Sequence, residues 1–392
     1  QYGIVLDLFG ASTSNAIQGN YIGLKSDNTV ATAKGLRGVW VEGGQNTIIS
    51  NNIISNFEKG IATEEDAMGN LIQLNKIGTD RTGTEARPNS IGVDLLSTGD
   101  IISENIISFN TGFGITFSDP TANAEISKND MVGNGDLAIS LTNSSTPLPN
   151  DTDDVDVSTV ANEGQNYPAI CISDAGTDTV LVSATLNSEA SGTYRIEIFQ
   201  SDSISQGGGG VFVGDTVVVM PSTETTLVAN FLVGADSSKF FTATATHLGN
   251  GFTSEFSATT AVVSPDFTTE VIYGDSLQVN FVGLGSANIT QYEWDFDADG
   301  LTDALNVLNT GYVYDTEGSQ AVSLLITAYS GCVSGGNAFV TTTTPFLNLT
   351  DSAALANFFT FDNANGNPTG IPWDLADRTF TWDSLRIRAG RA

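Results

Sequence analysis

The sequence predicts an all-β protein: a parallel β-helix, which is a solenoid of stacked coils, followed by two antiparallel β-sandwich domains and a short C-terminal segment. Three observations carry this prediction. One apolar and asparagine phrase recurs through residues 1–149, short runs of alternating apolar residues bounded by turn residues fill 171–345, and apolar residues spaced for an amphipathic helix are scarce.

Length and charge narrow the classes of function. A chain of 392 residues is too long for one ordinary core, so several domains are expected. The 45 Asp and Glu residues against 14 Lys and Arg give a net charge of −31, which disfavours nucleic acid and anionic membranes as partners. Divalent cations fit this charge better, and the alternative is a solubilising coat. No apolar run approaches the ~20 residues of a membrane span.

Neither the start of the chain nor its two cysteines indicates the compartment in which the protein is found. No signal peptide is recognised and the chain begins at Gln1, so we expect a processed or excised piece. Cys171 and Cys332 lie in different predicted domains, so a disulfide between them is not expected, and cysteine does not decide the compartment.

The recurring phrase reads N-x-I-x-x-N-x-I, and each copy is followed by a strand of the type G-I-x-x. A unit of about 22 residues cannot bury its apolar face alone, so successive copies must stack as coils. The alternation sends the isoleucines inward and leaves one asparagine per coil at a corner, where it can hydrogen-bond its equivalents above and below. The predicted ladder is Asn20, Asn51, Asn75, Asn105 and Asn129, and the predicted inward columns are Ile17, Ile48, Ile72, Ile102 and Ile126 and then Ile22, Ile53, Ile77, Ile107 and Met131.

The phrases "GNYIG", "NNIISN" and "GI" resemble the right-handed parallel β-helix family of secreted bacterial repeat proteins, and the likeness covers roughly residues 1–145. Handedness is implied by this resemblance. The family includes pectin lyases, polygalacturonases, non-enzymatic adhesins and fibres, so the fold leaves function open.

Two coils are longer than the others, through residues 23–37 and 78–91. Both insertions begin at the same corner of the coil, so we expect them side by side on one edge of the solenoid, where loops usually carry binding. The alternative is a pair of tolerated surface insertions.

The coils hold no complete catalytic signature, so no catalytic residue is assigned. The N-T-D, D-D and G-H-G set of a polygalacturonase is absent, and His247 lies outside the coils. A lyase would need clustered carboxylates beside an Arg or Lys, and Asp7, Glu42 and Glu64 follow three successive strands while Arg37 precedes Gly38. A row of solvent-facing acids is the alternative. Trp40 is expected to point outward, where its ring could stack on a sugar or pack at a seam.

Residues 150–170 form a polar segment dense in Asp, in which Asp151, Asp154 and Asp156 could bring carboxylates round one loop to bind Ca²⁺. The alternative is an unliganded acidic linker. Its N-D-x-x-D-x-D and Q-N-x-P phrases resemble the segment that joins such β-helices to a sandwich domain. The phrase "FTATATHLGNGFTSEFSA", within a predicted sandwich at 171–263, resembles the immunoglobulin-like module that follows these β-helices.

A third domain is predicted at 264–345, where "YEWDFDADGLTDA" and "YVYDTEGSQAVSLLITA" resemble the PKD domain, an extracellular β-sandwich. Its D-x-D-x-D-G-x-x-D spacing predicts a weak Ca²⁺ loop, although Asn306 stands where a calcium loop has its bidentate Glu, and a solvated acidic turn is the alternative. The segment 346–392 is expected to pack on another domain or another copy. The four acidic residues of the predicted loop are Asp295, Asp297, Asp299 and Asp303.

These observations favour an extracellular or cell-surface, non-enzymatic structural or adhesive protein with a rod-like form. The first coil begins at Gly3 without a preceding cap, so either sequence is missing upstream or another copy covers that end. In the second case we expect head-to-tail assembly into a filament, with the C-terminal segment as the complementary piece. The alternative is a polysaccharide lyase or glycan-binding protein acting on acidic polysaccharides.

Overall fold

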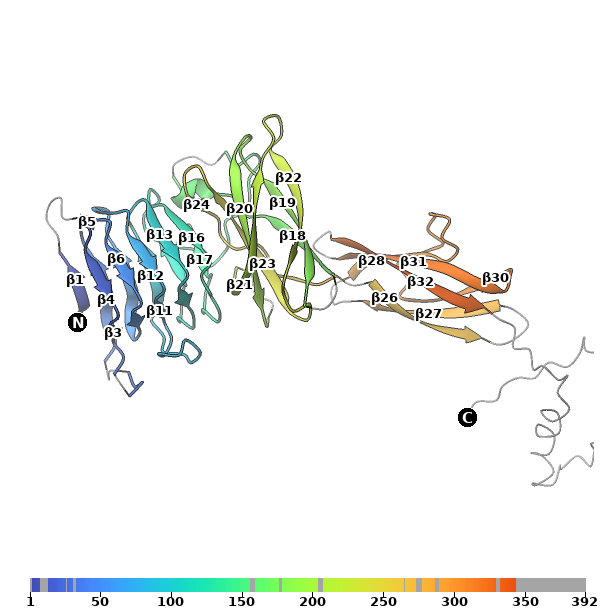
Figure 1. Cartoon of the computed structure of the whole chain (residues 1–392), viewed down its shortest axis with the longest axis horizontal. Helices are drawn as coiled ribbons and strands as arrows, with labels where there is room; N and C mark the ends of the chain where they lie inside the picture. The colour runs from blue at the N-terminus through green and yellow to red at the C-terminus, as the bar shows by residue number, and fades with distance from the viewer. Residues whose placement is uncertain are drawn as a thin grey trace, which may run out of the picture. The chain divides into compact units, whose positions relative to one another are not determined.

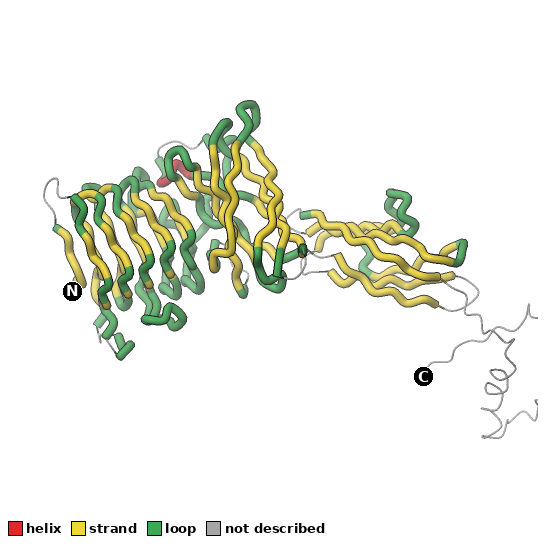
Figure 2. Tube along the Cα trace, in the orientation of Figure 1, coloured by secondary structure: helices red, strands yellow, loops and turns green. Residues whose placement is uncertain are grey.

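The computed structural model describes residues 2–7, 13–25, 27–30, 33–155, 159–175, 178–203, 207–263, 265–272, 277–285, 289–328 and 332–342. The chain divides into two compact units, Gln1–Ser264 with Ala328–Val333, and Pro265–Thr327 with Ser334–Ala392. Strands dominate both units, and a 3₁₀ turn, η1 (Ala161–Gly164), is the helical element of the described residues (Figure 2). The all-β prediction is confirmed. The predicted segment 346–392 lies outside the described residues.

Three parallel sheets built from successive coils make up the β-helix (Figure 1). The first contains β1 (Tyr2–Leu6), β4 (Gly35–Val41), β8 (Phe57–Thr63), β12 (Ile91–Leu95), β15 (Ile115–Phe117) and β17 (Ile139–Ser140). The second contains β2 (Ala16–Gln18), β6 (Ile48–Ser50), β10 (Leu71–Gln73), β13 (Asp100–Ser103) and β16 (Ala124–Ser127). The third contains β3 (Tyr21–Ile22), β7 (Ile53–Ile54), β11 (Lys76–Ile77) and β14 (Ile106–Ile107), and β5 (Gly44–Gln45) pairs with β9 (Ala67–Met68).

The register of the second coil differs from the prediction by one residue. Ile17 pairs with Ile49, and Ile22 pairs with Ile54, so Ile49 and Ile54 face the core rather than Ile48 and Ile53. The doubled phrase "IISNNII" satisfies the I-x-x-N-x-I spacing in either register, and the alignment on Asn46 selected the other one.

The asparagine ladder therefore runs through Asn52 instead of Asn51. Asn51 is the corner residue before the rung, with a φ of 56°. Asparagine tolerates this left-handed conformation better than most residues, which makes it a suitable corner residue. The same conformation precedes every other rung of the ladder, at Gly19, Leu74, Glu104 and Lys128.

Close approach of neighbouring coils explains the glycine that recurs in or just before the strands of the first sheet, except at β17, where Ala138 takes its place. A Cβ on Gly38 would lie 2.6 Å from the Gly60 carbonyl oxygen, and one on Gly60 would lie 2.5 Å from the Gly92 carbonyl oxygen. Neither contact tolerates a side chain, so the repeat keeps glycine where the coils touch.

An antiparallel sandwich follows the coils within the same compact unit. One sheet contains β18 (Ala169–Asp174), β19 (Val180–Asn187) and β22 (Thr226–Val233). The other contains β21 (Val211–Val219), β20 (Thr193–Ser201), β23 (Phe240–His247), β24 (Phe252–Thr253) and β25 (Thr260–Ala261).

The sandwich closes the last coil of the β-helix. Phe199 and Phe256 belong to the same buried cluster as Met131 and Ile139 of the coils. Backbone N–H groups of the last coil donate to the sandwich side: Met131 to the Gly210 carbonyl at 2.8 Å and Ile126 to Thr253 Oγ1 at 2.9 Å. The segment predicted as a linker also packs here, because Asn162 of η1 is buried. Coils and sandwich thus share one continuous core.

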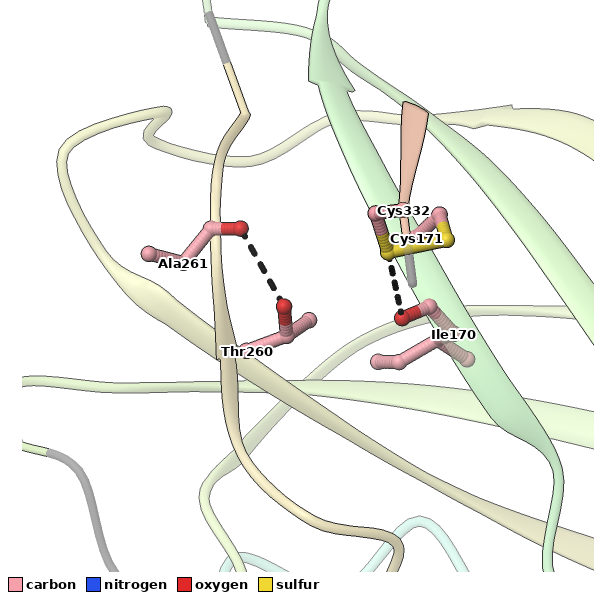
Figure 3. Close-up of a disulfide and its surroundings, with 5 residues drawn as sticks. All are labelled: Ile170, Cys171, Thr260, Ala261 and Cys332. Carbon is pink, nitrogen blue, oxygen red and sulfur yellow. Dashed lines mark hydrogen bonds between the residues drawn. A yellow bond between two sulfur atoms is a disulfide. The ribbon is translucent and has the colours of Figure 1, made fainter. Parts of the chain in front are cut away.

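A disulfide joins Cys171 of β18 to Cys332, against the expectation from the sequence (Figure 3). Domain limits that follow the sequence place the two cysteines in different domains, but the compact units are not continuous in sequence. The short segment Ala328–Val333 belongs to the compact unit of the first sandwich, although the strands on either side of it form the second sandwich. Cys332 Sγ lies 3.5 Å from the Ile170 carbonyl oxygen.

The second unit is an antiparallel sandwich with an aromatic core. One sheet contains β26 (Pro265–Ile272), β27 (Leu277–Gly285) and β30 (Asn309–Tyr314). The other contains β29 (Ala304–Leu305), β28 (Ile289–Asp295), β31 (Gly318–Ala328) and β32 (Val333–Thr342). Phe281, Trp294 and Phe296 are fully buried and their rings contact one another. No helix in the described part of the chain is long and apolar enough to cross a membrane.

Candidate functional sites

The outer face of the first sheet carries a cluster of Arg37, Trp40 and Glu64. The Arg37 guanidinium lies 4.1 Å from the centre of the Trp40 ring and 3.5 Å from Glu64 Oε1. Trp40 Nε1 donates to the same Glu64 oxygen at 2.8 Å, and the Tyr2 ring stacks on Trp40 with centroids 5.2 Å apart. The expected outward direction of Trp40 is therefore realised, but its ring contacts three protein side chains as well as solvent.

The three predicted acids lie near one another at the end of these strands. Loss of solvent contact, followed by the charges of Asp7 and Glu64, raises the pKa of Glu42, and Arg37 opposes the rise. This is an electrostatic cluster of three carboxylates and one guanidinium. Its guanidinium is engaged by a carboxylate and a ring, an arrangement that suits charge binding better than proton abstraction.

The two long coils place their insertions side by side, as expected. Each insertion is a small hairpin, closed by the Leu24–Val30 and Thr79–Ala86 bridges. Asn28 joins the two: its Nδ2 donates to Asp80 Oδ2 at 2.9 Å, and its carbonyl accepts from Arg87 Nε at 3.1 Å. We call these the paired hairpins, residues 23–36 and 76–91.

Asp80 organises the second hairpin. Its Oδ1 accepts backbone N–H groups from Thr82, Gly83, Thr84 and Glu85. Partial burial would raise the pKa of Asp80, but hydrogen bonds from Thr82 and Asn28 outweigh it and hold the pKa well below its usual range. The hairpin is preorganised by a carboxylate that stays ionised.

In the second unit, the acidic loop after β28 gathers Asp295, Asp297 and Asp303, whose carboxylate oxygens lie within 4.8 Å of one another. Asp299, the fourth predicted acid, is not part of this group, and its Oδ1 accepts the Leu301 N–H. Asp295 Oδ1 is buried without a hydrogen-bond partner among the described residues, and Gly300 takes a φ of 85° at the turn. Three converging carboxylates, one with an orphaned oxygen, fit the hard-oxygen ligand set of Ca²⁺.

The other predicted calcium loop is held by protein hydrogen bonds. Both oxygens of Asp154 accept from the chain, Oδ1 from the Asn166 N–H at 3.0 Å and Oδ2 from Gln165 Nε2 at 2.7 Å and from the Ser188 hydroxyl. Asp151 Oδ2 accepts the Val155 N–H. Asp156 lies outside the described residues, and calcium at this loop stays a prediction.

Residues 2–153 match the family model of the right-handed beta helix region. This match confirms the predicted β-helix. No curated protein matches the sequence significantly.

Solved structures give weaker likenesses. The two fibronectin type-III domain segment of chicken tenascin is 13% identical, with 45% of this chain and 100% of that chain covered and a TM-score of 0.18. The fibronectin(III)-like modules of Clostridium thermocellum CbhA are 14% identical over 44% and 94%, with a TM-score of 0.18. The enzymatically active domain of bacteriophage CBA120 tailspike protein 2 is 9% identical over 84% and 61%, with a TM-score of 0.22. At these TM-scores we draw no argument from them.

Several polar residues of the β-helix are not among the residues predicted from the sequence. A second ladder runs through Asn89, Asn110 and Asn134, and a third joins Asn70 to Asp100. An asparagine recurs three or four residues before Gly92, Gly114 and Ala138, and this spacing is the sequence signal of the second ladder. Buried Glu197 and Glu255 gave no such signal, because their partners at Lys128, Leu141 and Leu148 lie far away in sequence.

Proposed function

We propose that this chain is an extracellular, non-enzymatic structural or adhesive protein. In this proposal the β-helix is a rigid scaffold, the first sandwich is an immunoglobulin-like module, and the second unit is a PKD-like module. The observation that supports it is the continuous core of coils and sandwich. A scaffold of this kind holds surface loops in fixed positions without needing a catalytic cleft.

The extracellular location is supported by the disulfide. Disulfides form and persist in oxidising compartments and are rare in the reducing cytosol. Peptide mapping of unreduced protein from the producing cells should recover Cys171 and Cys332 in one cross-linked peptide pair. Both cysteines recovered as free thiols in freshly harvested cells would argue against an extracellular location.

The rival function is a polysaccharide lyase that uses the cluster of Arg37, Asp7, Glu42 and Glu64. A lyase should release unsaturated products from acidic polysaccharides, and Arg37→Gln should abolish the release. We expect no product from polygalacturonate or alginate at any calcium concentration, with or without that substitution. Product that disappears in the Arg37→Gln variant would replace our proposal with the lyase.

We also propose that copies assemble head to tail. Each of the three parallel sheets begins, in the described residues, with a strand of the first coil: β1, β2 and β3. Sheet ends of this kind accept further strands when a neighbour supplies them. Negative-stain electron microscopy over a concentration series tests this, since filaments with a regular repeat support assembly and single particles at every concentration contradict it.

Calcium is proposed as a ligand of the acidic loop in the second unit. Asp295, Asp297 and Asp303 would hold the ion, which would neutralise their mutual repulsion and fix the loop between β28 and β29. Its role would be structural, because all three ligands come from the one loop that the ion would hold in place.

A further inference from the structure

Positive charge gathers on the paired hairpins of an otherwise acidic protein. Residues 23–36 and 76–91 contain five basic residues against three acidic ones, a local charge of +2. The remaining residues of the chain therefore carry −33, because the total is −31. The basic residues are Lys25, Lys34, Lys76, Arg81 and Arg87, and the acidic ones are Asp27, Asp80 and Glu85.

The hairpins hold these cations on a fixed frame. Asn28 Oδ1 accepts the backbone N–H of Arg81 at 3.3 Å, in addition to its bonds with Asp80 and Arg87. Lys76 Nζ donates to the Arg81 carbonyl at 2.6 Å. One hairpin leaves the third sheet after β3 and the other after β11, so they arise two strands apart along the solenoid and meet through Asn28. A frame preorganised in this way reduces the entropy lost on binding.

Two of the cations are available to a ligand. Lys25 and Arg81 are exposed, and their side-chain nitrogens hydrogen-bond to no residue in the described ranges. The pKa of Asp27 is lowered chiefly by hydrogen bonds from Thr29 and to a smaller extent by the charge of Lys25. Arg81 has no ion pair among the residues that the structure describes.

An exposed aromatic ring lies on the same sheet. Tyr21 of β3 is 54% exposed and pairs with Ile53, which pairs in turn with Lys76 of β11. These side chains form one outward row, since Ile22, Ile54 and Ile77 face the core. Tyrosine offers an apolar face and a polar tip, a combination that suits the ring of a sugar.

We propose that the paired hairpins and Tyr21 bind an extended anionic polysaccharide, carboxylated or sulfated. Arg81 and Lys25 would contact acidic groups of successive units, and Tyr21 would stack on a sugar ring. Nucleic acid is disfavoured as the ligand, because its affinity depends on many phosphate contacts and the −33 charge elsewhere on the chain repels it. This inference rests on the proposed adhesive function and names its ligand.

The test measures binding of the full chain to polygalacturonate, dextran sulfate and neutral dextran by isothermal titration calorimetry at low and physiological salt. The double variant Lys25→Gln/Arg81→Gln should weaken binding to the anionic chains about tenfold. The matched control, Lys128→Gln/Lys239→Gln, removes two charges from the far coil and the first sandwich and should change affinity less than about twofold. Tyr21→Ala should lower affinity while leaving the salt dependence unchanged.

Binding to polygalacturonate, to dextran sulfate or to both supports the inference and tells carboxylated from sulfated ligands. Equal losses in the hairpin and control variants, or no binding to either anionic chain, overturn it. Equal binding to neutral dextran also overturns it. Cleavage of a bound chain would instead contradict the non-enzymatic function and leave the hairpin site standing.

Discussion

At the corner before each rung of the first asparagine ladder, one residue adopts the left-handed conformation. Leu74, Glu104 and Lys128 do so with φ values of 57°, 57° and 54°. For residues with a Cβ this conformation costs roughly 1–2 kcal/mol, so the rung geometry is maintained against local strain. The rungs compensate: Asn75 Nδ2 donates to both Asn105 Oδ1 and the Ile49 carbonyl, at 2.9 and 2.8 Å.

Relieving this strain should stabilise the coils. Leu74 is 47% exposed, so Leu74→Gly removes little packing and should raise the free energy of unfolding by about 0.5–1 kcal/mol. Urea unfolding followed by circular dichroism measures the change. As the control, Leu36→Gly alters a similarly exposed strand residue without a positive φ and should destabilise. A loss of stability in both variants would contradict the strain argument.

The corrected register makes a sharp prediction for two adjacent asparagines. Asn52→Ala should lower the free energy of unfolding by about 2–3 kcal/mol, because it removes the Nδ2 donor to the buried Ile17 carbonyl and to Asn75 Oδ1 and also the Oδ1 acceptor of the Asn20 N–H groups. Asn51→Gly keeps the corner conformation and should change it by less than about 0.5 kcal/mol. The opposite ranking in urea unfolding would restore the register read from the sequence.

At the scale of elements, the repeated phrase predicted the coils because each coil obeys the same local rule of inward isoleucine, corner and rung. This local rule does not determine the register of the doubled phrase "IISNNII", because two registers satisfy the rule. Only the pairing of Ile49 with Ile17 and Ile72 selects one of them. The paired hairpins were predictable for the same reason as the coils: their insertions begin at equivalent corners.

The junction between coils and sandwich could not be predicted. Its bonds join residues far apart in the sequence, in some cases by more than a hundred positions, as when Glu255 accepts the Leu141 and Leu148 N–H groups at 2.8 and 2.7 Å. Nothing near Glu255 in the sequence marks it as a cap of the last coil. The disulfide was not predicted, because Ala328–Val333 falls within the second sandwich in sequence order but belongs to the compact unit that contains the first sandwich.

Buried carboxylates should make this scaffold more stable in mild acid. Burial raises the pKa of Glu197 to about 7, against the charge of Arg195, and raises the pKa of Glu255 to about 6, against two backbone N–H groups. Burial likewise raises the pKa of Asp100 to about 6. Between the ordinary carboxyl pKa of about 4 and these values, the folded state binds more protons than the unfolded state. The free energy of unfolding should therefore fall as pH rises from about 5 to 7.

The measurement is the urea midpoint at several pH values across this range. Glu197→Gln should flatten the upper part of the profile, since its carboxyl has the highest of these pKa values. Asp80, whose pKa is depressed, is ionised in both states above about pH 5 and adds no slope in this range, so a midpoint that stays flat or rises with pH would contradict the raised pKa values.

The acidic loop of the second unit gives a prediction of its own. If calcium binds Asp295, Asp297 and Asp303, free calcium at 100 times its Kd should stabilise this unit by about 2.7 kcal/mol. Calorimetry with calcium and then with chelator would measure the shift in Tm. Asp297→Asn should remove most of it, whereas Asp266→Asn, an exposed acid of the same unit, should not. An equal Tm with calcium and with chelator would leave the loop as a solvated turn.

At the scale of the whole molecule, the proposed function depends on coils and first sandwich acting as one body. Phe199, Phe256 and Ala161 complete the apolar column that begins at Ile17. Asn162 extends the third ladder, since its Oδ1 accepts the Ala124 N–H at 2.8 Å and its Nδ2 donates to the Thr253 carbonyl at 2.7 Å. The apolar core and the polar ladder both continue across the junction. Unfolding of the coils without the sandwich would therefore expose part of the core and part of the ladder to water.

Hydrogen exchange of the full chain, followed by mass spectrometry, tests this claim most directly. Shared opening predicts that the most protected amides of β6, β10 and β13 have the same free energy of opening as those of β20 and β23, with the same dependence on denaturant. Coils that open at clearly lower free energy than the sandwich would contradict it, and the β-helix would then be a separate domain merely joined to its neighbour.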